Sequence, residues 1–283
     1  MGCTKAEIHD VYPLKQGLTN LSCHFATNDG EYVYRHPGIG TELLINRAGE
    51  VAAQKVAKEL GIDETFIHED PERGWKISHF IPDCHNLDPH DPAQVARAMR
   101  MARSLHESGV EVETTFDFYQ EAKRYESLLL EKGPIDIPGY AEDAADADAL
   151  EAFVVADGAP TCLCHNDFFM LNFLIDKADK YYLIDWEYSG MSDYANDFGT
   201  FCVCCQLSPE EVDAALEAYF GRKPTRAERA HNLAHIALAG WCWYLWSLLK
   251  EAEGDFVGEW LYIYYNYGRE YLTRALALYQ EEN

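Results

Sequence analysis

Three side chains between residues 165 and 187 have the types and the spacing that phosphoryl transfer requires. Asp167 is followed by Asn172 in the pattern His-x-Asp-x-x-x-x-Asn, and Asp185 ends an apolar run further along the chain. A carboxylate can orient and deprotonate a hydroxyl, while an amide oxygen and a second carboxylate can hold Mg²⁺ against phosphate oxygens. We therefore predict that Asp167 is a catalytic base and that Asn172 and Asp185 bind Mg²⁺.

The pairing of the two metal ligands depends on a predicted β-hairpin. Residues 172–175 and 181–185 are two apolar runs, and a turn rich in Asp and Lys separates them. If this hairpin closes symmetrically at Ala178-Asp179, Asn172 lies directly opposite Asp185, with their Cα atoms about 4.5–5.5 Å apart. Asp167 would then lie on the loop beside the metal.

The elements that precede these side chains are predicted to be mainly strands. Residues 8–14, 21–27 and 32–36 are short runs broken by turn signals, including Asn28-Asp29-Gly30. A helix follows, for which Asn46 is a plausible N-cap and Gly61 the stop, and residues 75–81 form another short strand.

This β-rich part contains candidate residues for binding the nucleotide. A tight loop between the first two strands could offer backbone N–H groups to phosphate. Arg35, on a predicted strand, could pair with the α- and β-phosphates of ATP, and Glu50, early in the helix, could hold Arg35 as a Lys–Glu pair does in protein kinases. The predicted nucleotide-binding set is Gly17, Leu18, Thr19, Asn20, Arg35 and Glu50.

The remainder of the chain is predicted to be mainly helical. Asp91-Pro92 is an N-cap followed by a first-turn proline, residues 116–132 form a second helix, and the last third is helical and rich in Trp and Tyr. We therefore predict an α+β fold with a β-rich nucleotide-binding lobe at residues 1–82 and a larger helical lobe at residues 83–283.

An aromatic group in the last third predicts a cationic substrate. Trp243 and Trp246 are three residues apart and share one helix face, whereas Trp241 points to the opposite side. Together with Tyr188 and Trp260 they could surround a quaternary ammonium through cation–π attraction, and Glu187 could add a compensating negative charge. We predict Glu187, Tyr188, Trp243, Trp246 and Trp260 as substrate-binding residues.

The overall composition agrees with a small-molecule enzyme. The 23 Lys and Arg against 48 Asp and Glu give a net charge of −25, which repels nucleic acid and anionic lipid. Nine cysteines, with no apolar secretory stretch, favour reduced thiols in the cytoplasm. The longest apolar run, residues 236–249, is too short to span a bilayer.

The strings at residues 38–47 (GIGTELLINR), 183–189 (LIDWEYS) and 243–246 (WYLW) resemble the choline/ethanolamine kinase family, in particular its bacterial LicA-type branch. This resemblance implies a protein-kinase-like fold, with ATP at the lobe junction, Asp167 as base and the tryptophan pair lining the choline pocket. It also implies that Asp197 braces the catalytic loop. The run Phe201-Cys202-Val203-Cys204-Cys205 stands where eukaryotic members carry a further acidic residue, so discrimination between choline and ethanolamine stays open.

The predicted function is that of a choline kinase, which transfers the γ-phosphate of Mg²⁺-ATP to the hydroxyl of choline. A kinase of another small alcohol on the same fold, acting on ethanolamine, thiamine or an aminoglycoside, is the alternative. A catalytically inactive kinase fold that serves as a binding module is a further one, although Asp167, Asn172 and Asp185 are all present.

Overall fold

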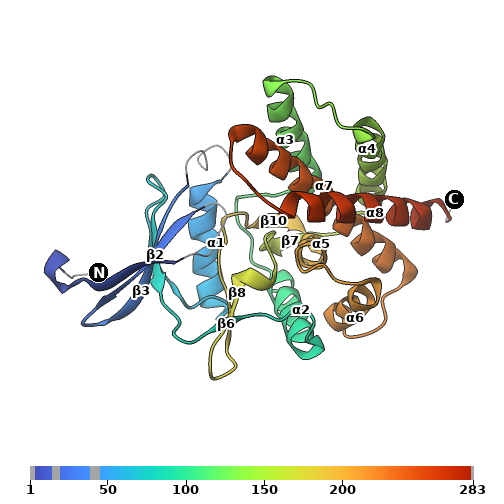
Figure 1. Cartoon of the computed structure of the whole chain (residues 1–283). Helices are drawn as coiled ribbons and strands as arrows, with labels where there is room; N and C mark the ends of the chain where they lie inside the picture. Colours follow the sequence, from blue (N-terminus) through green and yellow to red (C-terminus); the bar gives the residue numbers. More distant parts are fainter. Residues whose placement is uncertain (1–3, 15–19, 39–44, 282–283) are drawn as a thin grey trace. The chain divides into compact units, whose positions relative to one another are not determined.

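A computed structural model of the chain describes residues 4–14, 20–38 and 45–281. It is a mixed α+β structure, as the sequence predicts, with an antiparallel sheet near the N-terminus and helices toward the C-terminus (Figure 1). The chain separates into two compact units. The first comprises Met1–Leu87, Val112–Thr114 and Leu171–Ser189, and the second comprises Asp88–Glu111, Thr115–Met170 and Gly190–Asn283.

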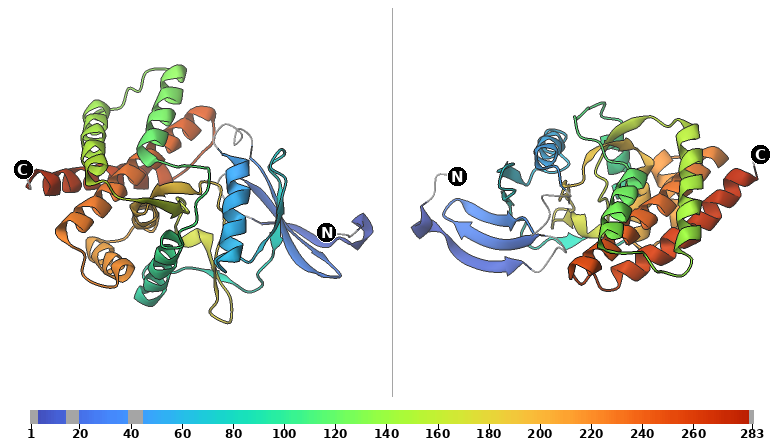
Figure 2. Two further views of the ribbon diagram at one scale, coloured as in Figure 1. Left: turned by 180° about the vertical axis from the view of Figure 1, so that it is seen from behind. Right: turned by 90° about the horizontal axis from the view of Figure 1, so that it is seen from above.

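The first unit is built on a five-stranded antiparallel sheet in the order β1-β2-β3-β5-β4. The strands are β1 (His9–Leu14), β2 (Leu21–Thr27), β3 (Gly30–His36), β4 (Phe66–Glu69) and β5 (Lys76–His79). Helix α1 (Arg47–Glu59) lies beside this sheet (Figure 2), and a short 3-10 helix (Lys5–Glu7) precedes β1.

Local sequence signals explain several of these elements. The β2–β3 register pairs Thr27 with Gly30, so the hairpin turns through Asn28-Asp29, as turn-forming residues predict. Asn46 caps α1, because its side chain accepts a hydrogen bond from the backbone N–H of Gly49 at 3.1 Å. Gly61, with φ +71°, then lets the chain leave the helix in a left-handed conformation.

A second, three-stranded sheet of the first unit has the order β6-β8-β9. Its strands are β6 (His85–Asn86), β8 (Phe173–Ile175) and β9 (Tyr181–Leu183), and a 3-10 turn (Met170–Asn172) leads into β8. The β8–β9 pair is the predicted hairpin.

The second unit is mainly helical. Its helices are α2 (Pro92–His106), α3 (Phe118–Lys132), α4 (Tyr140–Asp157), α5 (Ala195–Cys204), α6 (Pro209–Phe220), α7 (Arg226–Glu253) and α8 (Trp260–Gln280). A two-stranded ribbon joins β7 (Thr161–Cys164) to β10 (Gly190–Asp193). Helix α7 is the centre of this unit, since it packs against α3, α5 and α8 and is buried along most of its length.

Glycines allow the close approach of helices to α7. A Cβ atom added to Gly240 would lie 2.7 Å from the backbone nitrogen of Gly268, so α7 and α8 touch backbone to backbone at this point. On another side of α7, a Cβ atom on Gly199 of α5 would lie 2.4 Å from the backbone oxygen of His235. Any larger residue at these positions would force the helices apart. No helix in the described part of the chain is apolar over the length that crossing a bilayer requires.

Candidate active site

Arg35 is the centre of a buried ion-pair network in the first unit. It lies on β3, and its guanidinium donates hydrogen bonds to Glu50 of α1 and to Asp185. The structure therefore forms the Arg35–Glu50 pair that the sequence predicts. The Arg35 side chain is 6% exposed and that of Glu50 is fully buried, so the two charges are shielded from water.

Lys76 is a second cation of this network, and sequence reasoning missed it. The β3–β5 register places Arg35 directly opposite Lys76, an arrangement in which two like charges repel each other. Glu50 relieves this repulsion, because its Oε1 atom lies 3.2 Å from Nζ of Lys76 while also accepting from Arg35. Nζ of Lys76 is also 3.9 Å from Oδ1 of Asp185. The signal available in the sequence was a lysine within the predicted strand 75–81, whose other residues are mostly apolar.

Arg47, the first residue of α1, extends the network to Glu187. It donates to Oε2 of Glu50 at 2.8 Å and to Oε2 of Glu187 at 3.5 Å. Glu187 also accepts a hydrogen bond from the side-chain amide of Asn20 at 2.9 Å and lies 3.5 Å from Arg35. The structure thus places Asn20 and Glu187 together with Arg35, the predicted phosphate-binding cation. Glu187 as a partner for a substrate cation stays a prediction.

The electrostatics of the network separate its carboxylates into two kinds. Burial alone would raise the pKa of Glu50, but attraction to Lys76, Arg35 and Arg47 outweighs it and lowers that pKa well below its usual value. Burial raises the pKa of Glu69 to about 7, helped by repulsion from Glu50. Burial and then repulsion from Asp185 raise the pKa of Glu187 to about 7. Near neutral pH, Glu50 is therefore ionised, whereas Glu69 and Glu187 bind a proton more readily than an ordinary glutamate does.

The two predicted metal ligands flank the β8–β9 hairpin, but their register differs from the expectation by one residue. The ladder pairs Phe173 with Leu183, and the backbone N–H of Ile184 donates to the carbonyl of Asn172 at 2.9 Å. Asn172 is therefore opposite Ile184, and Asp185 lies one residue beyond. The expected closure at Ala178-Asp179 was wrong.

The turn of the hairpin explains the shift. The backbone N–H of Lys180 and that of Ala178 both donate to Oδ1 of Asp176, at 2.9 and 2.8 Å. Asp179 adopts a left-handed conformation with φ 60°. This five-residue turn is centred on Ala178 itself rather than on the bond that follows it.

The oxygen donors at the end of this hairpin have the chemistry that Mg²⁺ requires. Asp185 has φ 69°, which is uncommon for a residue with a side chain, and its carboxylate is 31% exposed while that of Glu187 is 3% exposed. A carboxylate and an amide are hard oxygen ligands, and a half-exposed carboxylate leaves room for water or phosphate. Asn172 and Asp185 therefore fit a magnesium ion.

Asp167 lies in the second unit on a loop that Asp197 holds in place. The fully buried carboxylate of Asp197 accepts hydrogen bonds from the backbone N–H groups of His165 and Asn166, at 3.0 and 2.6 Å. His106 contacts the same carboxylate at 3.0 Å. Asp197 therefore braces the loop that carries Asp167, while the catalytic role of that loop stays a prediction.

Asn166 completes the fixed conformation of this loop. Its backbone is left-handed, with φ 66°, and its carbonyl accepts a hydrogen bond from the Thr200 hydroxyl at 3.0 Å. Its side chain accepts from the amide of Asn196 at 3.2 Å. Because the residue before Asp167 is tied down at its backbone N–H, carbonyl and side chain, the direction in which the chain presents Asp167 is set.

The predicted aromatic residues lie on two helices of the second unit. Trp243 and Trp246 of α7 are 4% and 6% exposed and meet edge to face, with ring centroids 6.2 Å apart. Trp243 also packs against Phe118 at 5.6 Å. On α8, Trp260 stacks on Tyr264 with centroids 5.7 Å apart.

The neighbouring aromatic residues differ in exposure. Tyr264 is buried, whereas Tyr262 is 67% exposed. Tyr188 is buried and belongs to the first unit. Trp241 is as buried as Trp243 and packs against Tyr140. The predicted nucleotide-loop residues Gly17, Leu18 and Thr19 lie outside the described residues.

An antiparallel sheet that carries a buried Arg–Glu pair, together with a braced loop aspartate in a helical unit, defines a phosphotransferase with a protein-kinase-like fold. A family model described as the phosphotransferase enzyme family matches residues 10–231, and the chain belongs to this family.

Individual relatives agree along nearly the whole chain. Protein LicA of Haemophilus influenzae strain Rd is 25% identical over 273 residues, which cover 93% of this chain and 99% of the relative. The crystal structure of choline kinase LicA from Streptococcus pneumoniae is 27% identical, with a TM-score of 0.83, and covers 95% of this chain and 94% of that one. A crystal structure of LicA in complex with AMP is 26% identical, with a TM-score of 0.82, and covers 95% of this chain and 92% of that one. These similarities confirm the family resemblance that the sequence predicts.

Proposed function

We propose that this protein is a choline kinase that transfers the γ-phosphate of ATP to the hydroxyl of choline. The observation that carries the proposal is the edge-to-face pair Trp243–Trp246 on α7, in a chain whose LicA relatives match it over almost its full length. Indole rings attract a quaternary ammonium through cation–π interaction, whereas the alcohol of the substrate offers only a hydrogen bond.

In this proposal the first unit binds the nucleotide. Arg35 and Lys76 are two buried cations on adjacent strands, and Glu50 holds both of them. Fixed cations of this kind neutralise phosphate oxygens without having to reorganise when the nucleotide arrives. The complex of a LicA protein with AMP supports nucleotide binding by this fold. Residues 1–82 would form the core of this nucleotide-binding lobe.

Asn172 and Asp185 would hold Mg²⁺. When bound, the ion would neutralise charge that develops on the phosphates. Asp185 also accepts a hydrogen bond from Arg35, so the bound metal ion and the phosphate-binding Arg35 would share the carboxylate of Asp185. That sharing fixes the orientation of the Asp185 side chain.

Asp167 of the second unit would accept the proton of the substrate hydroxyl as the oxygen attacks phosphorus. Its loop is fixed by Asp197 and Thr200, so the carboxylate is oriented before the substrate binds. Such pre-organisation matters because a misplacement of about 1 Å can cost a factor of about 100 in rate. Since the reaction consumes ATP and the described cysteines are free thiols, we also propose that it takes place in the cytoplasm.

A coupled ADP-release assay with Mg²⁺-ATP tests this proposal against choline, ethanolamine, thiamine and an aminoglycoside. We expect the highest kcat/KM for choline. Preference for another alcohol would keep the catalytic residues and refute the choline cage. No ADP release with the whole panel, from protein that still binds ATP, would refute the choline kinase assignment and favour a binding role.

A further inference from the structure

A second cluster of polar side chains lies in the helical unit, and the proposed phosphotransfer does not use it. Asp193, at the end of β10, faces two histidines of α7, His231 and His235. Nε2 of His231 is 3.0 Å from both carboxylate oxygens of Asp193, and Nε2 of His235 is 3.5 Å from one of them. The three ligand atoms lie within 4.8 Å of one another, and both histidines are 4% exposed.

Outer hydrogen bonds fix which nitrogen of each imidazole points into the cluster. Nδ1 of His231 is 2.8 Å from Oδ2 of Asp157, and Nδ1 of His235 is 2.8 Å from Oδ1 of Asn196. A carboxylate and an amide oxygen can only accept, so each Nδ1 carries a proton. A neutral imidazole in this tautomer presents a bare lone pair at Nε2.

For His231 the same rule also places a proton on Nε2, because that atom is hydrogen-bonded to the carboxylate of Asp193. Among the described residues, Nε2 of His235 has no hydrogen-bond partner although it is buried. A metal ion at this point would replace the Nε2 proton of His231 and would also give Nε2 of His235 a partner. Buried polar atoms are normally satisfied, so this arrangement requires an explanation.

We propose that Asp193, His231 and His235 bind a divalent transition-metal ion of the Zn²⁺ type, with three protein ligands and an open fourth position. Ligands held at about 2.0–2.1 Å around a tetrahedral ion are roughly 3.3–3.5 Å apart, close to the 3.0 and 3.5 Å separations of Asp193 from the two imidazoles. The Asp157–His231 contact is the carboxylate–histidine pairing that orients metal ligands. Asp193 and Asp157 together supply the negative charge that balances a dication.

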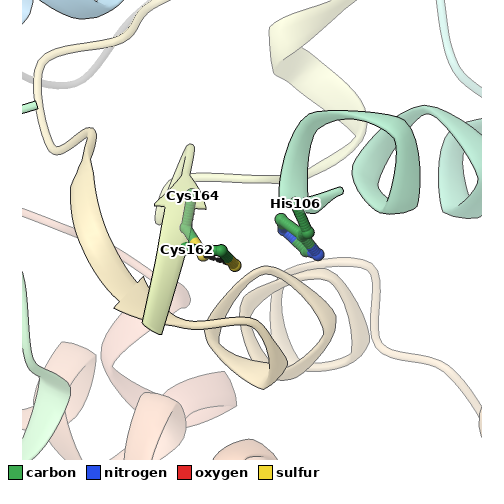
Figure 3. A group of neighbouring side chains, drawn as sticks. All are labelled: His106, Cys162 and Cys164. Atoms are coloured by element: carbon green, nitrogen blue, oxygen red, sulfur yellow. Dashed lines mark hydrogen bonds between the residues drawn. The ribbon is translucent and has the colours of Figure 1, made fainter. Parts of the chain in front are cut away.

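A neighbouring group of possible ligands lacks this arrangement. Figure 3 shows Cys162 and Cys164 of β7 facing His106 at the end of α2. Both ring nitrogens of His106 are already engaged, Nδ1 with the Tyr219 hydroxyl at 2.8 Å and Nε2 with Asp197 at 3.0 Å. Burial also raises the pKa of the Cys164 thiol well above its usual value, which opposes the thiolate that a metal needs. Metal binding there would break the bracing of the catalytic loop.

The proposed metal would stabilise the same loop from the other side. His235 holds Asn196, and the amide of Asn196 donates to the side chain of Asn166, next to Asp167. The ion would therefore connect β10 and α7 to the residue that precedes the proposed catalytic base. We assign the ion the role of supporting this loop, because its ligands reach the loop through Asn196.

Zn²⁺ binding to the full chain tests this proposal. Protein dialysed against a chelator and returned to buffer with Mg²⁺ is titrated with Zn²⁺, and metal content and melting temperature are measured. We expect one Zn²⁺ per chain and a higher melting temperature. His235→Gln should weaken Zn²⁺ binding at least roughly tenfold, whereas His90→Gln, which removes a histidine that is 61% exposed, should not change it.

If His235→Gln fails to fold, the absorption spectrum of the Co²⁺-substituted wild-type protein identifies the metal ligands. Visible bands of four-coordinate Co²⁺ with nitrogen and oxygen ligands in the wild-type protein would support the site. Intense thiolate-to-cobalt absorption would instead assign the metal to Cys162 and Cys164 and overturn the proposal. Equal Zn²⁺ affinity of the wild type and His235→Gln would also overturn it and leave the cluster as a hydrogen-bonded charge network. None of these readouts depends on phosphotransfer, so this proposal and the proposed function fail separately.

Discussion

Replacing Asp197 by asparagine tests the bracing of the catalytic loop with the least change in shape. Oδ2 of Asp197 accepts from the backbone of His165 and from His106, and Oδ1 accepts from the backbone of Asn166. An asparagine can place its oxygen where two donors meet, but its NH₂ group must then face the N–H of Asn166. The backbone N–H of Asn166 then loses its charge-assisted hydrogen bond and faces the NH₂ group, which is another donor.

The magnitude follows from these contacts. A hydrogen bond to a charged group contributes about 1.5–3 kcal/mol, and a buried N–H left without an acceptor costs about 1–3 kcal/mol. We expect Asp197→Asn to lower the free energy of unfolding by about 3–4 kcal/mol, because Asp197 is fully buried. For a chain of this size that corresponds to a melting temperature roughly 6–15 °C lower. A loop displaced by about 1 Å would also lower kcat about 100-fold.

The assay combines thermal unfolding with the coupled ADP-release measurement below the melting temperature of the variant. Asp213→Asn is the matched control, because Asp213 is 52% exposed and pairs only at the surface with Arg229 at 2.9 Å. It should change the stability by less than about 0.5 kcal/mol. If Asp197→Asn had the same melting temperature as Asp213→Asn and kept the wild-type kcat, the bracing role of Asp197 would be refuted.

Three further changes test the other assignments. Asp167→Asn should lower kcat by at least about 100-fold, while the affinity for ATP, measured by calorimetry, stays within about twofold of the wild type. Turnover at the wild-type rate would refute the assignment of Asp167 as the base. Trp243→Leu should raise KM for choline by roughly 2- to 30-fold and leave KM for ATP unchanged. Trp241→Leu, on the opposite face, should lower the melting temperature and change neither KM value. Equal effects of the two variants on the KM for choline would make Trp243 a core residue only. Glu69 has a pKa raised to about 7 from 4.5, so the native state binds its proton more tightly than the unfolded state and stability falls as pH rises between these values. Glu69→Gln removes this pH dependence. Its free energy of unfolding, measured by urea denaturation, should exceed that of the wild type by on the order of 1–3 kcal/mol at pH 8 but by little at pH 5. Parallel curves of stability against pH for the two proteins would contradict the raised pKa of Glu69.

Local signals were enough to predict many elements from the sequence. Asn46 and Asp91 both cap helices through their side chains, as their residue types predict. The Asn28-Asp29 turn likewise predicted the β2–β3 hairpin. These features depend on neighbours a few residues away, so they are visible in the sequence itself.

Features that depend on exact registers were less accessible. The β8–β9 hairpin was predicted, but its register was off by one residue, because Asp176 organises the turn through its side chain. Lys76 was missed since its importance arises only when β5 pairs with β3 and places it opposite Arg35. The sequence contains both residues but not the pairing that joins them.

The helical unit shows a second limit. Helix α7 is buried on almost every side, so its pattern does not distinguish a ligand-facing tryptophan from a core tryptophan. His231 and His235 stand at helical spacing in the sequence, but their partner Asp193 comes from a strand 38 residues before His231. Only the fold brings such residues together.

The backbone contact at Gly240 and Gly268 has a consequence for how this protein can change over evolution. Because α7 and α8 meet through main-chain atoms there, the separation of the two helices does not depend on the size of the aromatic side chains that they carry. Replacing Trp246 on α7 or Trp260 on α8 would therefore leave this crossing point in place, whereas the loss of the buried Trp246 ring would still cost packing energy. If Trp246 and Trp260 contact the substrate as proposed, such a frame would let substrate preference drift among small alcohols while the crossing of α7 and α8 is kept.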